Sequence, residues 1–195
     1  MPVESLDALY TDLQRLVFIA SGVDQGRVIL ADQGRPPPEP QGDLYATYNP
    51  IPVRAVGHPR TSLALVDPVA DYNESLLGSD WQDFEATTIT QLDLMLSCNF
   101  LNEGARDAAW KLHNANFRYP VTDQLWSMQA GWRFASDVRR LTDIYQAGLQ
   151  PRYQVDVHLY IATQIKDAIL RAAGFSVSVE DEDGNEVISF TSNTA

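Results

Sequence analysis

Two stretches of strictly alternating side chains limit most strongly what this chain can fold into. In residues 153–161 (YQVDVHLYI) every second side chain is large and apolar, and in residues 91–96 (QLDLML) three leucines alternate with glutamine, aspartate and methionine. Successive side chains of a β-strand point to opposite faces, so each stretch predicts a strand with one face in a core. The chain is therefore expected to build a sheet that is apolar on at least one side.

Helical periodicity surrounds these strands. Leu6, Leu9, Leu13, Leu16 and Val17 recur at steps of three and four, which predicts an amphipathic helix that stops at Gly22. Asn102 is expected to cap a helix running to Asn116, whose inner side carries Ala105, Ala108, Ala109 and Leu112. Two further helical segments are expected, one starting at Pro120 or Thr122 and interrupted by Gly131, and one over residues 166–173 closed by Gly174.

The other segments read as strands and loops. Residues 27–31 predict a short strand. Residues 43–56 look extended, but Pro50 and Pro52 lack a backbone N–H, so the middle of this segment is expected at a sheet edge, in a bulge or in a kink. Residues 58–79 predict a long loop or an excursion with broken strand pairing, and residues 131–136 are ambiguous between strand and helix. Residues 175–190 predict a hairpin with Asp183 and Gly184 at its turn.

Together these elements predict one α+β domain over residues 1–195, with one mixed, mainly antiparallel sheet packed against helices. A Pro-rich loop at 34–42, a long excursion at 57–80 and the C-terminal hairpin would extend from it as loops or arms. Residues 91–96 and 154–159 share a Gln-apolar-Asp-apolar pattern. A duplicated strand-helix unit would produce this shared pattern. Two half-exposed strands of one sheet also have similar sequences, and we favour that explanation.

The charge balance excludes several classes of partner. The 195 residues carry 14 lysines and arginines against 26 aspartates and glutamates, a formal charge of −12. Broad binding of nucleic acid or anionic lipid needs clustered basic residues, so neither is expected. The single cysteine, Cys98, has no disulfide partner within the chain, and no basic leader or membrane-length apolar run is present. A reducing compartment such as the cytoplasm is the expected place of synthesis or assembly.

The motifs of known chemistries are missing from the sequence. His58, His113, His158 and Cys98 are too widely spaced for a zinc site, and the acidic run at residues 180–186 lacks the frame of an EF-hand. There is no nucleophile elbow, P-loop or dinucleotide fingerprint. His158 beside Asp156 could act as a general base, but surface hydrogen bonding is the better explanation. We therefore predict no catalytic, cofactor or metal residues.

Residues 22–36 (GVDQGRVILADQGRP), which enclose a short strand between glycine turns and a proline run, resemble the bacteriophage neck or tail-terminator family of contractile-tailed phages. The order of later elements is also similar, and the resemblance covers most of the chain. Departures are the middle from His58 to Gln82 and the aromatic block near Trp126.

The resemblance implies a non-enzymatic virion protein, assembled in the host cytoplasm, that forms a ring, hexameric by family analogy, around a central DNA passage. Its partners would be other copies of itself, tail tube and sheath proteins, and a head-completion or connector protein, with DNA passing unbound and no membrane. Tryptophan, tyrosine and extended proline segments suit subunit contacts. The candidate interface residues are therefore Arg35, Pro36, Pro37, Pro38, Trp126 and Trp132.

Two alternatives stay open at this point. One is another phage neck component, such as a collar or connector. The other is a small hydrolase whose carboxylate site is hidden by sequence order. Deleting residues 35–41 is expected to impair assembly more than folding of the single chain, because an exposed proline-rich loop adds little to a core.

Overall fold

The computed structural model describes residues 6–31, 42–67, 82–141, 143–145, 148–169, 174–180 and 186–193. The chain clusters into two compact units. The first comprises Met1–Pro59 and Ile89–Gln164, and the second comprises Arg60–Thr88 and Ile165–Ala195. The long strands β2 (Tyr45–Val66), β3 (Asp83–Leu101) and β8 (Arg152–Ile169) contribute residues to both units.

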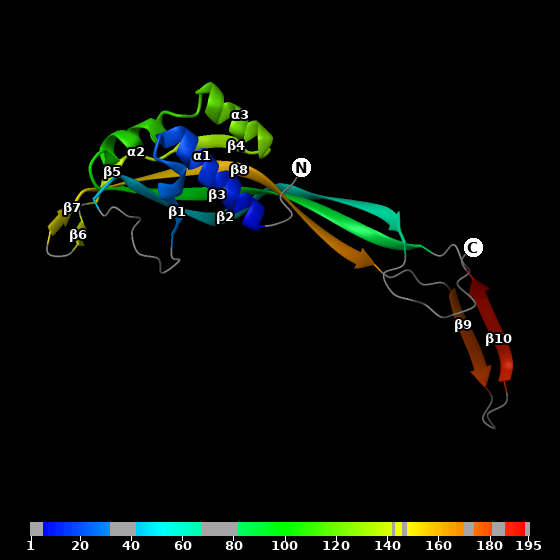
Figure 1. Ribbon diagram of the computed structural model, residues 1–195. Helices are drawn as coiled ribbons and strands as arrows, with labels where there is room; N and C mark the ends of the chain where they lie inside the picture. Colours follow the sequence, from blue (N-terminus) through cyan, green and yellow to red (C-terminus); the bar gives the residue numbers. More distant parts are fainter. Residues whose placement is uncertain are drawn as a thin grey trace. The chain divides into compact units, whose positions relative to one another are not determined.

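In the described part of the chain, six strands form the main sheet, in the order β1-β2-β3-β8-β4, with β5 also paired to β8 (Figure 1). The outer strands are short: β1 (Val28–Leu30), β4 (Gly131–Ala135) and β5 (Arg139–Arg140). Strand β1 is parallel to β2, whereas β4 and β5 are antiparallel to β8. Side-chain contacts pair Asp93 with His158 and Ser97 with Gln154, so β3 and β8 are also antiparallel. The predicted α+β fold with one mixed sheet is confirmed.

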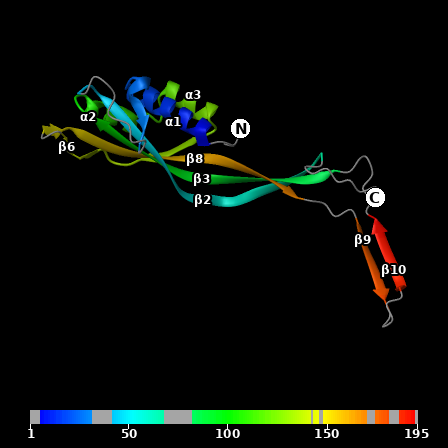
Figure 2. The same cartoon turned by 60° about the horizontal axis from the view of Figure 1, so that its bottom comes forward.

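Three helices of the first unit, α1 (Leu6–Ser21), α2 (Ala105–His113) and α3 (Tyr119–Ser127), lie on the same face of the sheet (Figures 1 and 2). The core between them contains Leu13 and Leu16 of α1, Leu112 of α2, Phe100 of β3 and Leu159 of β8, all fully buried. The predicted apolar faces of both alternating strands are confirmed. The opposite face of the sheet carries the intervening polar side chains, and no described helix covers it.

The predicted stop of the first helix at Gly22 is close to the observed end, but the predicted cap of the second helix is wrong. Helix α1 ends at Ser21, and Gly22 follows with a φ of +76°, a conformation that favours glycine. Helix α2 begins at Ala105, after Gly104 with a φ of +82°. Asn102 also has a positive φ and does not cap α2, because its Oδ1, the atom that would accept in a cap, instead accepts from Gln150 Nε2 at 2.7 Å. Its Nδ2 donates to the Asp43 carbonyl at 2.8 Å.

Strand β2 continues without a break through Pro50 and Pro52, where an edge, a bulge or a kink was expected. Its pairing with β1 covers only Ala46–Tyr48, and Pro50 and Pro52 follow that register, so their missing N–H groups interrupt no bond to β1. The loop predicted from residue 58 is wrong as far as Val66, because β2 runs beside β3 there. Thr61 Oγ1 lies 3.3 Å from Thr88 Oγ1. Residues 68–80 of the expected excursion lie outside the described residues.

The helix predicted over residues 166–173 is also wrong where the structure describes it. Strand β8 continues to Ile169, and Lys166 Nζ lies 3.7 Å from Glu85 of β3, in the same register that pairs His158 with Asp93. Pairing with β3 overrides the local helical pattern. Residues 170–173 lie outside the described part.

The described residues also form two separate two-stranded sheets. Strand β6 (Asp143–Tyr145) is antiparallel to β7 (Gly148–Gln150), and β9 (Gly174–Glu180) is antiparallel to β10 (Glu186–Asn193). The second pair lies in the segment for which the sequence predicts a hairpin. Its expected turn at Asp183 and Gly184 lies outside the described residues.

Candidate functional site

The face of the sheet that no described helix covers is organised around the buried carboxylate of Asp93. Its side chain is only 2% exposed, although it points away from the helices. Oδ2 pairs with Arg133 Nη1 of β4 and lies 3.9 Å from Arg54 Nε of β2, while Oδ1 lies 3.1 Å from His158 Nδ1 of β8. One carboxylate thus joins side chains from four neighbouring strands. We call Arg54, Asp93, Arg133 and His158 the Asp93 cluster.

An irregularity in β4 completes the Asp93 cluster. Trp132 pairs with Leu159 and Phe134 with His158, so Arg133 is an extra residue and Phe134 falls on the polar face. The Phe134 ring stacks on the His158 ring at a centroid distance of 4.3 Å, and the Arg133 guanidinium lies 5.3 Å from the Phe134 ring centre and 5.5 Å from the Tyr160 ring centre. Both ring distances lie within the range of a cation–π contact, so the two rings add to the interactions that hold the Arg133 guanidinium.

The contacts of this cluster suit a structural role. An aspartate bonded to histidine can orient the imidazole for general-base catalysis, in which the other ring nitrogen takes a proton from a reacting group. The hydrogen-bond partner that the structure gives His158 is the carboxylate of Asp93, and Phe134 covers one face of its ring. Asp156, the partner considered from sequence, instead accepts from Gln154 Nε2 at 3.0 Å.

Among the exposed aromatic side chains on the helical side, three are almost fully exposed to water. Phe117 is 91% exposed, Tyr119 is 82% exposed and Trp126 is 84% exposed. The first two lie where α2 connects to α3, and Trp126 lies on α3 next to the buried Leu125. Arg118, which precedes α3, donates from Nη1 to the Ala20 carbonyl of α1 at 2.7 Å and so fixes the start of α3. Exposed aromatic clusters of this kind mark protein-binding surfaces.

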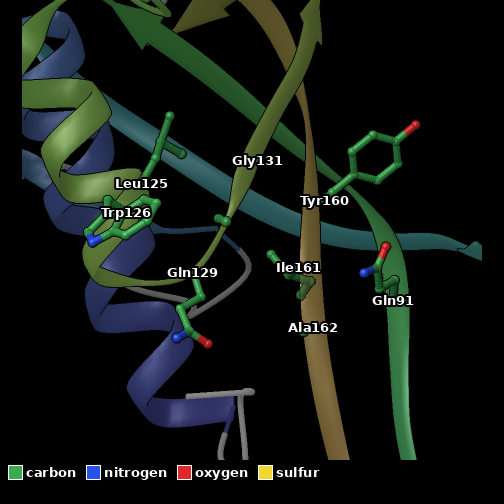
Figure 3. A pocket seen from close by; sticks show the side chains of 9 residues that line it. Gln91, Leu125, Trp126, Gln129, Gly131, Tyr160, Ile161 and Ala162 are labelled. Atoms are coloured by element: carbon green, nitrogen blue, oxygen red, sulfur yellow. The ribbon is translucent and has the colours of Figure 1, made fainter. Parts of the chain in front are cut away.

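Two hollows of about 470 and 350 Å³ share the side chains of Leu125, Trp126 and Ala130. We call them together the Trp126 groove. Figure 3 shows Leu125 and Trp126 of α3 on one side of the larger hollow and Ile161 and Ala162 of β8 on another. The smaller hollow is also lined by Phe117, Trp132, Asn116 and Thr122. The lining is mostly apolar and includes a few polar side chains.

The structure separates the interface residues proposed from sequence. Trp126 is exposed in the groove, whereas Trp132 is half-buried, packs against the core and also lines the smaller hollow. Arg35, Pro36, Pro37 and Pro38 lie outside the described residues. Sequence reasoning missed Phe117 and Tyr119. A signal for them was available in the sequence. Both lie between the buried apolar residues of α2 and those of α3, and neither continues the helical spacing of these buried residues.

Cys98 is a buried thiol in the core of the first unit. Burial raises the pKa of this thiol well above its usual range, and the negative charge of Asp156 raises it further. Since only the thiolate is a good nucleophile, we expect Cys98 to stay unmodified in the folded protein during hours with iodoacetamide at pH 8. Mass spectrometry should show full alkylation after unfolding in urea. Rapid alkylation of the native protein would contradict the buried placement.

A metal centre has no support in the described residues, where no three histidine, cysteine, aspartate or glutamate side chains gather as they would around an ion. Among the helices that the structure describes, none has both the length and the apolar character needed to cross a membrane.

A comparison with individually curated proteins finds no match. The family model described as phage neck terminator protein matches residues 7–185.

Proposed function

The chain belongs to the phage neck terminator family, and from this premise we propose that its copies form a ring that ends the tail and joins it to the head-completion complex. Members of the family are structural proteins of the phage neck, and thus components of the virion. The family match carries the proposal, because residues 7–185 include sequence from both compact units and most of the main sheet.

The exposed surfaces of the first unit support ring formation. A closed ring of identical subunits needs two different surfaces on each copy, which meet head to tail. The aromatic side chains of Phe117, Tyr119 and Trp126 offer one apolar surface on the helical side. Short outer strands, β1 with three residues and β4 with five, leave main-chain groups of the sheet edges for a neighbour.

The proposed ring has about six copies and surrounds a passage for DNA. Its partners are tail tube and sheath proteins on one side and a head-completion or connector protein on the other. The formal charge of −12 supports a passage without adhesion, because acidic residues facing a lumen repel phosphate groups. In this role the chain performs no catalysis, and the Asp93 cluster holds four strands of the sheet together.

Negative-stain electron microscopy of the purified chain, with mass measurement on a sizing column, tests the proposal. We expect rings of about six copies, with head-to-tail contacts and a central opening. A closed two-fold dimer would contradict it, as would a strict monomer both alone and with neck partners. A ring of different symmetry that binds a portal-side protein but no tail tube would favour a collar or connector role.

A further inference from the structure

The Trp126 groove has the chemistry of a site for proline-rich peptides. Such peptides adopt a polyproline helix, whose rings pack between aromatic side chains while its free carbonyls accept hydrogen bonds from the groove. Trp126, Trp132 and Phe117 all line the smaller hollow, together with the polar side chain of Asn116. A tryptophan that is 84% exposed beside such a hollow gains much from a stacked proline ring.

The chain carries one segment that fits this chemistry. Residues 35–40 read RPPPEP and contain four of the eleven prolines of the protein. The positive charge of Arg35 comes directly before the prolines. On the groove side, the exposed Asp123 lies three residues before Trp126 on α3, and therefore on the same side of the helix. The positive charge of Arg35 beside the prolines is therefore complementary to the negative charge of Asp123 beside the Trp126 groove.

Chain geometry places the segment and the groove on different copies. Pro40 is joined to Tyr45, the first residue of β2, by five residues that span at most about 18 Å. Asp93 and His158 lie beside Arg54 of β2 in the sheet. The groove residues Gln91 of β3 and Tyr160 of β8 lie two residues further along their strands, away from the Tyr45 end of β2. Arg54 is nine residues after Tyr45, or roughly 30 Å along the strand. Pro40 therefore cannot reach the groove of its own chain.

We propose that the Trp126 groove binds residues 35–40 of a second copy of this chain. The inference rests on the proposed ring, for which it supplies one of the two surfaces that meet at each contact. Proline rings stack against Trp126 and Phe117, and Arg35 pairs with Asp123. Because a proline segment is already stiff before it binds, little conformational entropy is lost in the contact.

A labelled peptide of residues 32–41 tests the groove directly. It is titrated into a full-length chain in which Pro36, Pro37, Pro38 and Pro40 are serine, so that the groove is free, and its fluorescence anisotropy is followed. We expect saturable binding that weakens at least tenfold with Trp126→Ala. The matched control is Trp110→Ala, which removes an exposed tryptophan of α2 outside the groove lining and is expected to leave binding unchanged.

A charge exchange tests the orientation. Asp123→Lys is expected to weaken the peptide at least threefold, and a peptide with Arg35→Glu should regain affinity for that variant. Failure of the exchanged pair to recover, or equal weakening by Trp110→Ala and Trp126→Ala, would overturn the proposed contact.

Assembly of the full chain separates this inference from the proposed function. A photoreactive residue at position 37 should cross-link to residues 116–132 of another copy, and Trp126→Ala should abolish that adduct. Rings that form normally in the Trp126→Ala chain, together with no peptide binding, would overturn the inference and leave the ring intact. An absence of rings in every chain would overturn the ring, while the peptide titration would still decide whether the groove binds the segment.

Discussion

Phe100→Ala is expected to lower the free energy of unfolding of the first unit by about 4 kcal/mol. Phe100 lies on β3 with no exposed surface and is among the largest fully buried side chains of the described core. Truncation removes the transfer free energy of the ring and leaves a cavity that the helices and the sheet can fill only in part. Urea unfolding followed by tryptophan fluorescence measures the change at one protein concentration.

Phe117→Ala is the matched control for this experiment. It removes the same ring from a position that is 91% exposed, so the unfolding midpoint should hardly move. Should Phe100→Ala prevent folding altogether, Phe100→Leu gives a smaller loss that can still be measured. Equal effects of the substitutions at positions 100 and 117 would contradict the placement of β3 under the helices.

Asp93→Ala is expected to cost about 3 kcal/mol, which is unusual for a residue on a sheet face that no described helix covers. The variant leaves Arg133 and Arg54, both of which lie near Oδ2, without the negative charge that holds them together. His158 also loses its hydrogen-bond acceptor while Phe134 still covers its ring. The same urea experiment applies, and Asp93→Asn should lose less because an amide oxygen can still accept from His158.

Glu85→Ala serves as the control for Asp93→Ala. It also removes a carboxylate from an ion pair on the same strand, but Glu85 and Lys166 are both partly exposed, 3.7 Å apart. Pairs of this kind contribute at most about 1 kcal/mol because water competes for both charges. If Asp93→Ala were as mild as Glu85→Ala, the cluster would not be holding the four strands together.

The role of the exposed aromatic residues follows from this contrast. Substitutions in the core or in the Asp93 cluster should change stability, whereas substitutions of Trp126 should change contacts between copies and leave the unfolding midpoint almost unaltered. The side chains that stabilise the sheet are thus different from the exposed side chains expected to contact other copies. This difference allows stability and assembly to be measured independently in the same set of variants.

Local pattern was enough to predict the main elements. Alternation placed Leu94, Leu96 and Val157 on the core face, and helical spacing located α1 and the buried alanines of α2. These signals depend on residues within one element, so they survive without knowledge of the neighbours. The glycine and proline residues around β1 also pointed to the neck terminator family, which the match over residues 7–185 confirms.

Contacts between residues far apart in the sequence could not be predicted from the local sequence pattern. Residues 166–169 have helical spacing, yet they form a strand because β3 offers them a paired edge. The irregularity in β4 moves Phe134 to the polar face, and Asp93 is buried only because three other strands bring Arg54, Arg133 and His158 to it. Nothing in the sequence distinguished the exposed Trp126 from the half-buried Trp132. Which neighbour a side chain meets depends on strand register and packing across the whole sheet, and these long-range terms arise only when the chain has folded.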